Sequence, residues 1–132
     1  MRTIKFRGWN RKNKQWLYGF YLQNRGAHFV CPDEFAYSKS WEDYEVEAET
    51  VGQFTGLHDK MGREIYEGSI VRTNEGYGPA VIEYLGGALI LRWKDGGWLS
   101  LAEYDGNIEQ PDLDSDEVIG NIHDNPEMLK HG

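Results

Sequence analysis

The fold is decided by the stretch Ala80-Val81-Ile82-Glu83-Tyr84-Leu85-Gly86-Gly87-Ala88-Leu89-Ile90-Leu91-Arg92-Trp93. Two runs rich in aliphatic and aromatic residues flank a Gly-Gly pair, and this pattern predicts an antiparallel hairpin. Short apolar runs separated by glycine turns continue from Ile70 to Ile122, with a helical turn expected at residues 102–105. Such a series is typical of a small antiparallel barrel of the SH3-like kind. We therefore expect a mostly β protein (β or α+β) with little helix.

The N-terminal residues predict a further β element. Residues 3–9 alternate polar with apolar side chains, which is the period of a strand with one buried face, and Lys5 and Arg7 fall on its outward side. An aromatic run at residues 16–22 follows a polar turn at residues 10–15. The simplest structure is an antiparallel hairpin with a basic tip.

Chain length and patterning indicate one folded unit. The 132 residues fall in the size range of a single domain. The segment 32–50 has no clear period and predicts a long loop with at most a helical turn. We expect a single domain over residues 1–132, in which the hairpin and acidic loop (1–50) pack on a barrel-like region (51–132).

Charge is strongly segregated along the chain, although the formal net charge is −8. Residues 1–32 hold seven basic side chains and no acidic one, whereas the remainder holds 7 Lys and Arg against 22 Asp and Glu. The densest acidic stretch, residues 33–49, follows the basic one directly. Neighbouring patches of opposite sign favour pairing with each other, and the overall negative charge opposes non-specific attraction to nucleic acid or anionic lipid.

The sequence also indicates a compartment. No stretch approaches the length of a membrane-spanning helix, and the N-terminus lacks the apolar run of a signal peptide. The single cysteine, Cys31, excludes an internal disulfide and is typical of a reducing compartment. We expect a cytoplasmic protein.

The basic hairpin is the first candidate site. It combines cationic side chains that neutralise phosphate with flat rings on which bases stack, as single-stranded nucleic-acid binders do. Pairing of this strip with the acidic residues 33–49, within or between chains, is the favoured alternative. The candidate residues for binding nucleic acid or a partner are Lys5, Arg7, Trp9, Arg11, Lys12, Lys14 and Trp16.

A polar hairpin around residue 59 is the second candidate. Asp59 can cap a turn through the backbone, and Gly62 suits a positive φ. Turn chemistry alone accounts for most of the residue types present, so a scaffold role is favoured over a ligand site. The cluster comprises Gln53, Thr55, Asp59, Arg63, Tyr66 and Glu67.

Metal and catalytic constellations find little support in the sequence. His28 and Cys31 share a metal-ligand spacing, but no second close pair completes a closed zinc site. The acidic run 112–116 resembles the start of a calcium loop, yet lacks the glycine and the bidentate Glu that follow in an EF-hand. Cys31 with His58 or His123 as the base lacks any surrounding nucleophile signature. We expect no enzyme activity, no metal and no cofactor.

Three blocks of the sequence resemble the YopX-like proteins encoded by bacteriophages and prophages. They are residues 2–9, 50–71 and 118–127, and together they extend over almost the full length. Family members usually carry Ala in place of Gly8, Asp in place of Asn10 and Asp in place of Ser69. The last difference removes a carboxylate, so any role that rests on this acid is in doubt for the present chain. The resemblance implies a mobile-element origin, a β-rich domain and a cytoplasmic setting in a bacterial host, and implies no activity.

These features lead to three hypotheses about function. The first is a non-enzymatic phage accessory protein that acts by protein–protein contact, either with a host or phage protein or with itself as a homo-oligomer. The second is nucleic-acid binding by the basic hairpin. The third is an acidic surface that mimics DNA and so inhibits a host protein.

Overall fold

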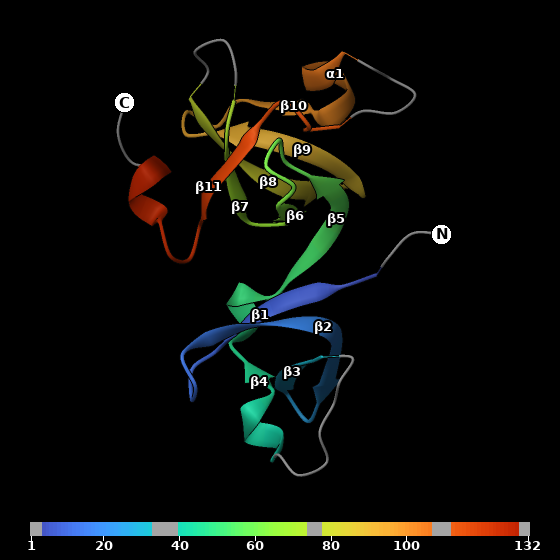
Figure 1. Cartoon of the computed structure of the whole chain (residues 1–132), viewed down its shortest axis with the longest axis vertical. Helices are drawn as coiled ribbons and strands as arrows, with labels where there is room; N and C mark the ends of the chain where they lie inside the picture. Colours follow the sequence, from blue (N-terminus) through green and yellow to red (C-terminus); the bar gives the residue numbers. More distant parts are fainter. Residues whose placement is uncertain (1–3, 33–39, 74–77, 107–111, 130–132) are drawn as a thin grey trace. The chain divides into compact units, whose positions relative to one another are not determined.

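The computed structural model describes residues 4–32, 40–73, 78–106 and 112–129. In these residues the predicted mostly β fold is confirmed, with little helix (Figure 1). The chain divides into two compact units, Met1–Phe54 (unit 1) and Thr55–Gly132 (unit 2). Their boundary lies inside a strand rather than at residue 50. No helix among the described residues is long and apolar enough to cross a membrane.

Unit 1 is built on an antiparallel sheet in the order β4-β3-β2-β1-β5. Its elements are β1 (Phe6–Asn10), β2 (Gln15–Asn24), β3 (Ala27–Cys31), the 3-10 turn η1 (Trp41–Asp43), β4 (Glu45–Val46), the 3-10 turn η2 (Ala48–Thr50) and the first residues of β5 (Gly52–His58). The predicted hairpin is β1 with β2, in which Trp9 pairs with Trp16. The described part of the expected long loop contains η1, β4 and η2, so it is more regular than its sequence suggests.

Two glycines allow close packing in unit 1. A Cβ atom at Gly19 would lie 2.0 Å from the Cys31 carbonyl oxygen, so β2 passes β3 at a distance that admits no side chain. A Cβ atom at Gly8 would lie 2.8 Å from the Val46 side chain. Val46 is itself buried in a cluster with Leu17 and Val30, so it has little room to move.

We expect Gly8→Ala to lower the free energy of unfolding by about 1–3 kcal/mol, because the added methyl overpacks the core against Val46. Urea unfolding of unit 1 followed by tryptophan fluorescence measures this change. The double variant Gly8→Ala/Val46→Ala removes the clash and is expected to be more stable than the sum of the two single losses predicts. Additive losses would contradict the packing explanation.

Unit 2 is built on an antiparallel sheet in the order β10-β9-β8-β7-β11. Its elements are the end of β5, β6 (Glu64–Tyr66), β7 (Ser69–Arg72), β8 (Pro79–Leu85), β9 (Ala88–Trp93), β10 (Trp98–Ser100), the helix α1 (Leu101–Asp105), β11 (Glu117–Asn121) and the 3-10 turn η3 (Pro126–Leu129). The β8–β9 hairpin turns at Gly86-Gly87, as predicted, with Leu85 opposite Ala88. The second half of β5 pairs with β6.

The expected SH3-like barrel is not closed. The sheet of unit 2 has two edges, β10 and β11, which are not paired in the described structure. The chain leaves β10 after three residues, where Ser100 caps α1. The Ser100 hydroxyl accepts a hydrogen bond from the Glu103 N–H at 3.2 Å, and the Glu103 carboxylate accepts one from the Ser100 N–H at 3.2 Å. β10 therefore ends at Ser100, and in the described structure it has β9 as its neighbour and does not pair with β11.

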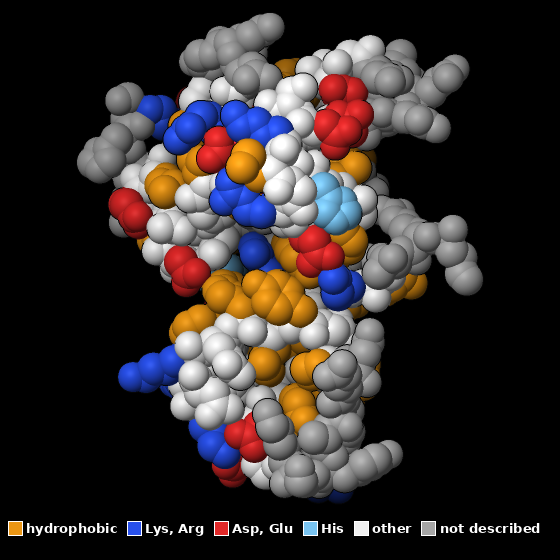
Figure 2. All heavy atoms as spheres, viewed as in Figure 1, with side chains coloured by type: hydrophobic (Ala, Val, Ile, Leu, Met, Phe, Trp, Pro, Cys, Tyr) orange, Lys and Arg blue, Asp and Glu red, His pale blue; other side chains and the backbone are white. Residues whose placement is uncertain are grey.

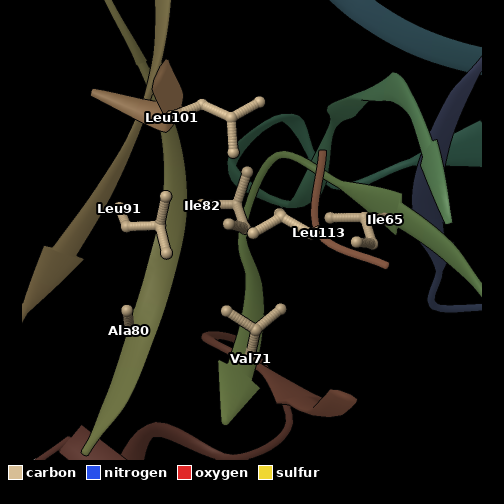
Figure 3. Close-up of a cluster of buried hydrophobic side chains, with 7 residues drawn as sticks. All are labelled: Ile65, Val71, Ala80, Ile82, Leu91, Leu101 and Leu113. Carbon is tan, nitrogen blue, oxygen red and sulfur yellow. The ribbon is translucent and has the colours of Figure 1, made fainter. Parts of the chain in front are cut away.

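The core of unit 2 lies on one face of this sheet (Figure 3). Alternate residues of β7, β8 and β9 point into it, as the period of a half-buried strand requires. Side chains from outside the sheet close it, Leu101 from α1 and Leu113 from the segment before β11. The cluster comprises Ile65, Val71, Ala80, Ile82, Leu91, Leu101 and Leu113.

Candidate functional site

Arg7 of the basic hairpin is buried, although the strand pattern predicts that it faces outward. Only 8% of the residue is exposed, and its guanidinium carbon lies 4.9 Å from the centre of the Trp16 ring. The β1–β2 register places Arg7 opposite Tyr18, beside Trp16, so the neighbouring rings cover it. Arg7 therefore contributes packing rather than an open surface charge.

The tip of the hairpin is neutralised within the chain. Arg11 forms an ion pair with Glu47, and Lys12 Nζ lies 3.1 Å from Asp43 Oδ1 and 3.7 Å from Glu42 Oε2. Hydrogen bonds from Asn13 and then from Lys12 lower the pKa of Asp43 to about 2. The expected pairing of basic and acidic segments is thus present inside one chain for these two cations.

Asn10 holds the acidic segment beside the hairpin. This fully buried side chain donates from Nδ2 to the carbonyl oxygens of Glu42 at 3.1 Å and Glu45 at 2.7 Å, and its Oδ1 accepts from the Asn13 N–H at 2.7 Å. The resulting groove encloses about 570 Å³. Its lining is Asn10, Arg11, Lys12, Glu42, Glu45, Val46, Glu47 and Glu49, and we call it the acidic groove.

The other residues of the basic hairpin do not form one surface charge patch. Lys5 lies over the ring of Phe54, with Nζ 5.3 Å from its centre. Trp9 packs edge-on against Trp16 at 5.6 Å between ring centres. Lys14 is exposed and adopts a positive φ of 53° in the turn, and no described acidic residue lies within ion-pair distance of it.

An apolar surface runs along β2 and was not predicted from the sequence as a site. Alternate side chains of this strand share one face, and Tyr18 and Phe20 on it are 44% and 47% exposed. The face continues into an apolar groove of about 210 Å³ lined by Leu22, Asn24, Phe29 and Trp41. Hydrophobic side chains gather over β1 and β2 in Figure 2. The residues Trp16, Tyr18, Phe20 and Leu22 are called the aromatic face below.

In the polar hairpin, Asp59 organises the turn between β5 and β6. Its Oδ1 accepts from the N–H groups of Met61 at 2.9 Å and Arg63 at 2.8 Å, and its Oδ2 accepts from the Val118 N–H at 2.9 Å. Burial alone would raise the pKa of Asp59, but these backbone hydrogen bonds and the Arg63 charge outweigh it and hold the pKa below its usual value. Gly62 takes the predicted positive φ, 81°.

The remaining polar residues of this hairpin are engaged with the scaffold or lie apart. Thr55 Oγ1 donates to the Ile65 carbonyl at 2.7 Å, and Tyr66 donates its hydroxyl proton to Glu64 at 2.8 Å. Gln53 lies in unit 1, where it pairs with Phe6, and Glu67 is half-buried at the β6–β7 turn. None of these side chains lines the acidic groove.

Arg63 instead joins a cationic cluster that sequence reasoning missed. It comprises Lys60, Arg63 and Arg72, grouped around Glu117 on β11: Glu117 oxygens lie 3.5 Å from Lys60 Nζ, 3.4 Å from Arg63 and 3.8 Å from Arg72. Arg63 Nε also lies 3.2 Å from Asp59 Oδ2. Lys and Arg side chains gather in this part of unit 2 in Figure 2. The separation between Arg63 and Glu117 is 54 residues, so no local pattern reveals the cluster.

Cys31 is buried in unit 1, and the nearby His28 is in contact with Tyr21. Cys31 is fully buried, and burial raises the pKa of its thiol, which disfavours the reactive thiolate. His28 Nδ1 lies 2.5 Å from the Tyr21 hydroxyl oxygen and its ring stacks on Tyr21. Among the described residues, no group of three or more His, Cys, Asp or Glu side chains is arranged to hold a metal; His131 lies outside them.

The acidic run 112–116 forms a turn rather than a calcium loop. Asp112 Oδ1 accepts from the Asp114 N–H at 3.0 Å, and Asp116 Oδ1 accepts from the Tyr104 hydroxyl at 2.7 Å. Burial raises the pKa of Asp116 above its usual value. The Asp116 carboxylate therefore holds the loop to α1, and the Asp112 carboxylate closes the turn itself.

Comparison with known proteins assigns the chain to a family. The family model described as "YopX protein" matches residues 5–130. The chain belongs to the YopX family. The fold is also similar to that in a crystal structure of protein EF1440 from Enterococcus faecalis, with 26% sequence identity, a TM-score of 0.59, and coverage of 98% of this chain and 100% of that one. No curated protein matches.

The three positions at which the sequence resemblance implies a different residue have structural roles in this chain. Gly8 accommodates Val46, and Asn10 bridges the carbonyl groups of the acidic segment. Ser69, where the sequence resemblance implies Asp, is fully buried and accepts from the Tyr66 N–H at 3.0 Å. Since Ser69 keeps an oxygen acceptor for this turn, the absence of the acid removes no contact that the turn needs.

Proposed function

We propose that this YopX protein is a phage- or prophage-encoded accessory protein that acts in the bacterial cytoplasm, without catalysis, by binding another protein through its aromatic face. The family resemblance supports the mobile-element origin. The exposure of Tyr18 and Phe20, beside the apolar groove, is the observation that carries the contact function.

Aromatic side chains dominate protein–protein interfaces because they bury a large area at low cost in conformational entropy. The aromatic face presents two half-exposed rings on a rigid central strand, so little ordering is needed when a partner binds. Trp41, 55% exposed and in edge-on contact with Phe29, extends the apolar surface at the groove. A partner that offers apolar side chains would fit this surface.

The same region gives less support to nucleic-acid binding. Arg11 and Lys12 are paired with carboxylates, and Arg7 is buried against Trp16. Phosphate would have to displace these carboxylates, and the segment that carries them is held to β1 by the hydrogen bond from the Glu47 N–H to the Trp9 carbonyl oxygen at 3.0 Å. The formal net charge of −8 adds repulsion at long range.

The double variant Tyr18→Thr/Phe20→Thr tests the proposal by affinity capture from cells of the natural host. Thr keeps the strand propensity while removing both rings. We expect the amount of captured partner to fall by about tenfold or more, as when interface anchors are truncated.

Leu85→Thr is the matched control, because Leu85 is 44% exposed at the end of β8 in unit 2. Thermal melting confirms that each variant is folded. Equal capture of the same proteins by wild type and Tyr18→Thr/Phe20→Thr would contradict a contact function for this face. Capture of nucleic acid in equal amounts by both proteins would also contradict it.

A further inference from the structure

Two surfaces of opposite charge have no part in the function proposed for the aromatic face. They are the acidic groove of unit 1 and the cationic cluster of unit 2. We propose that the cationic cluster of one copy binds in the acidic groove of a second copy. This inference rests on the proposed contact function, because it names a second copy of the chain as one partner. The contact uses none of the residues of the aromatic face.

The cationic cluster has more positive charge than its own carboxylates can match. Arg63 is held between Asp59 and Glu117, which fixes its side chain in place. The same Glu117 carboxylate also pairs with Lys60 and Arg72, because its Oε2 lies 3.5 Å from Lys60 Nζ and 3.8 Å from Arg72 Nη1. Both distances are at the long end of the range for an ion pair. The Lys60 and Arg72 side chains are 49% and 66% exposed, so both are open to an incoming carboxylate.

The acidic groove has more negative charge than its own cations can match. Arg11 and Lys12 are matched by Glu47 and Asp43. Glu45 and Glu49 are exposed at the groove, and no cation among the described residues lies within ion-pair distance of either. A volume of about 570 Å³ admits the long side chains of Arg and Lys. The lining also includes the apolar side chain of Val46, on which their methylene groups can pack.

Physical reasoning favours a protein segment over nucleic acid as the occupant of the cationic cluster. Nucleic acid carries a charge at every phosphate and would extend over the acidic remainder of the chain, where it is repelled. A groove with a few carboxylates presents its charge locally, and salt screens the net repulsion between two copies beyond about 8 Å at physiological ionic strength. Met61, 66% exposed in the same turn as Lys60, adds an apolar contact that a phosphate backbone does not use.

Because the two surfaces differ, the contact is head-to-tail, and it produces rings or open chains of molecules rather than a two-fold dimer. Sedimentation velocity over a range of protein concentrations tests this directly. We expect species larger than the monomer at about 0.05 M NaCl and their loss at about 0.5 M NaCl, where the Debye length is only a few ångströms.

Charge reversal assigns the contact to its two surfaces. Lys60→Glu/Arg72→Glu and Glu45→Lys/Glu49→Lys are each expected to weaken self-association by about tenfold or more. An equimolar mixture of the two variants is expected to associate again, because each then offers the surface that complements the other. Arg63 is left intact in this design, since it contacts the buried Asp59.

The controls Lys14→Glu/Lys94→Glu and Asp114→Lys/Glu127→Lys change the net charge by the same amounts at other exposed positions and are expected to associate as wild type does. A wild type that is monomeric at every concentration in low salt overturns the proposal. Variants that associate normally, or a mixture that does not recover, also overturn it. The proposal is also overturned if monomeric protein retains a labelled single-stranded oligonucleotide and this retention requires Lys60 and Arg72. None of these results bears on Tyr18 or Phe20, so the proposed contact function stands or fails separately.

Discussion

Replacing Asp59 with Asn is expected to lower the free energy of unfolding by about 3 kcal/mol at pH 7, through loss of charge-assisted hydrogen bonds to a buried carboxylate. The Asn side-chain oxygen can still accept from the N–H groups of Met61 and Arg63. Its NH2 group, however, would replace Oδ2 and face the Val118 N–H and the Arg63 guanidinium. All three groups are hydrogen-bond donors, so no hydrogen bond can form there. Urea unfolding followed by circular dichroism measures the loss.

The pH dependence identifies the cause. The pKa of Asp59 is lowered in the folded protein, so its contribution to stability is present above the unfolded pKa of about 4 and is lost as the pH falls through the folded value. We expect Asp59→Asn to differ from wild type most at neutral pH and least in acid. Asp95→Asn is the control, because Asp95 makes an exposed turn hydrogen bond to the Gly97 N–H that Asn can also make. A loss at Asp59 that is the same at every pH would contradict this explanation.

The opposite exchange, Asn10→Asp, is expected to lower the free energy of unfolding by about 2–4 kcal/mol at pH 7. A carboxylate at this buried position can keep the hydrogen bond from the Asn13 N–H. It cannot donate to the carbonyl groups of Glu42 and Glu45, whose oxygens would instead face its negative charge. The acidic segment should then separate from β1, and Tyr44 with it, which near-ultraviolet circular dichroism reports.

The pH signature of this variant has the reverse sign from that of Asp59. Burial beside two carbonyl oxygens raises the folded pKa of an aspartate, so a stabilising contribution exists below the unfolded value and is lost as the pH rises through the folded one. Asn10→Asp is therefore expected to approach wild-type stability in mild acid. The exposed exchange Asn24→Asp at the end of β2 serves as the control. An Asn10→Asp protein as stable as wild type at pH 7 would show that the two carbonyl groups do not need this donor.

Much of the local structure could be predicted because it depends on neighbouring residues. The Gly86-Gly87 hairpin and the positive φ at Gly62 follow from alternation and turn chemistry, and the helical turn expected at residues 102–105 is found as Leu101–Asp105. Each requires only contacts within a few residues. The expected SH3-like barrel did not follow, because closure depends on whether two distant edge strands meet.

The candidate sites were predicted less completely because they depend on long-range pairing. The basic hairpin was identified from composition, but the burial of Arg7 depends on the register that sets it beside Trp16. The pairing of Lys12 with Asp43 was anticipated only as an attraction between segments. No local sequence pattern indicates the grouping of Lys60 and Arg72 around Glu117.

The sequence by itself determined the β class, the hairpins, the charge segregation and membership of the YopX family, because each is written in residue types at short spacing. Only the tertiary structure decided which charges are satisfied and which face outward. Asn10 and Asp59 show the physical reason. Besides their local partners, the buried amide and the buried carboxylate each bind backbone groups 32–59 residues away, and only the folded chain brings those groups within hydrogen-bond distance.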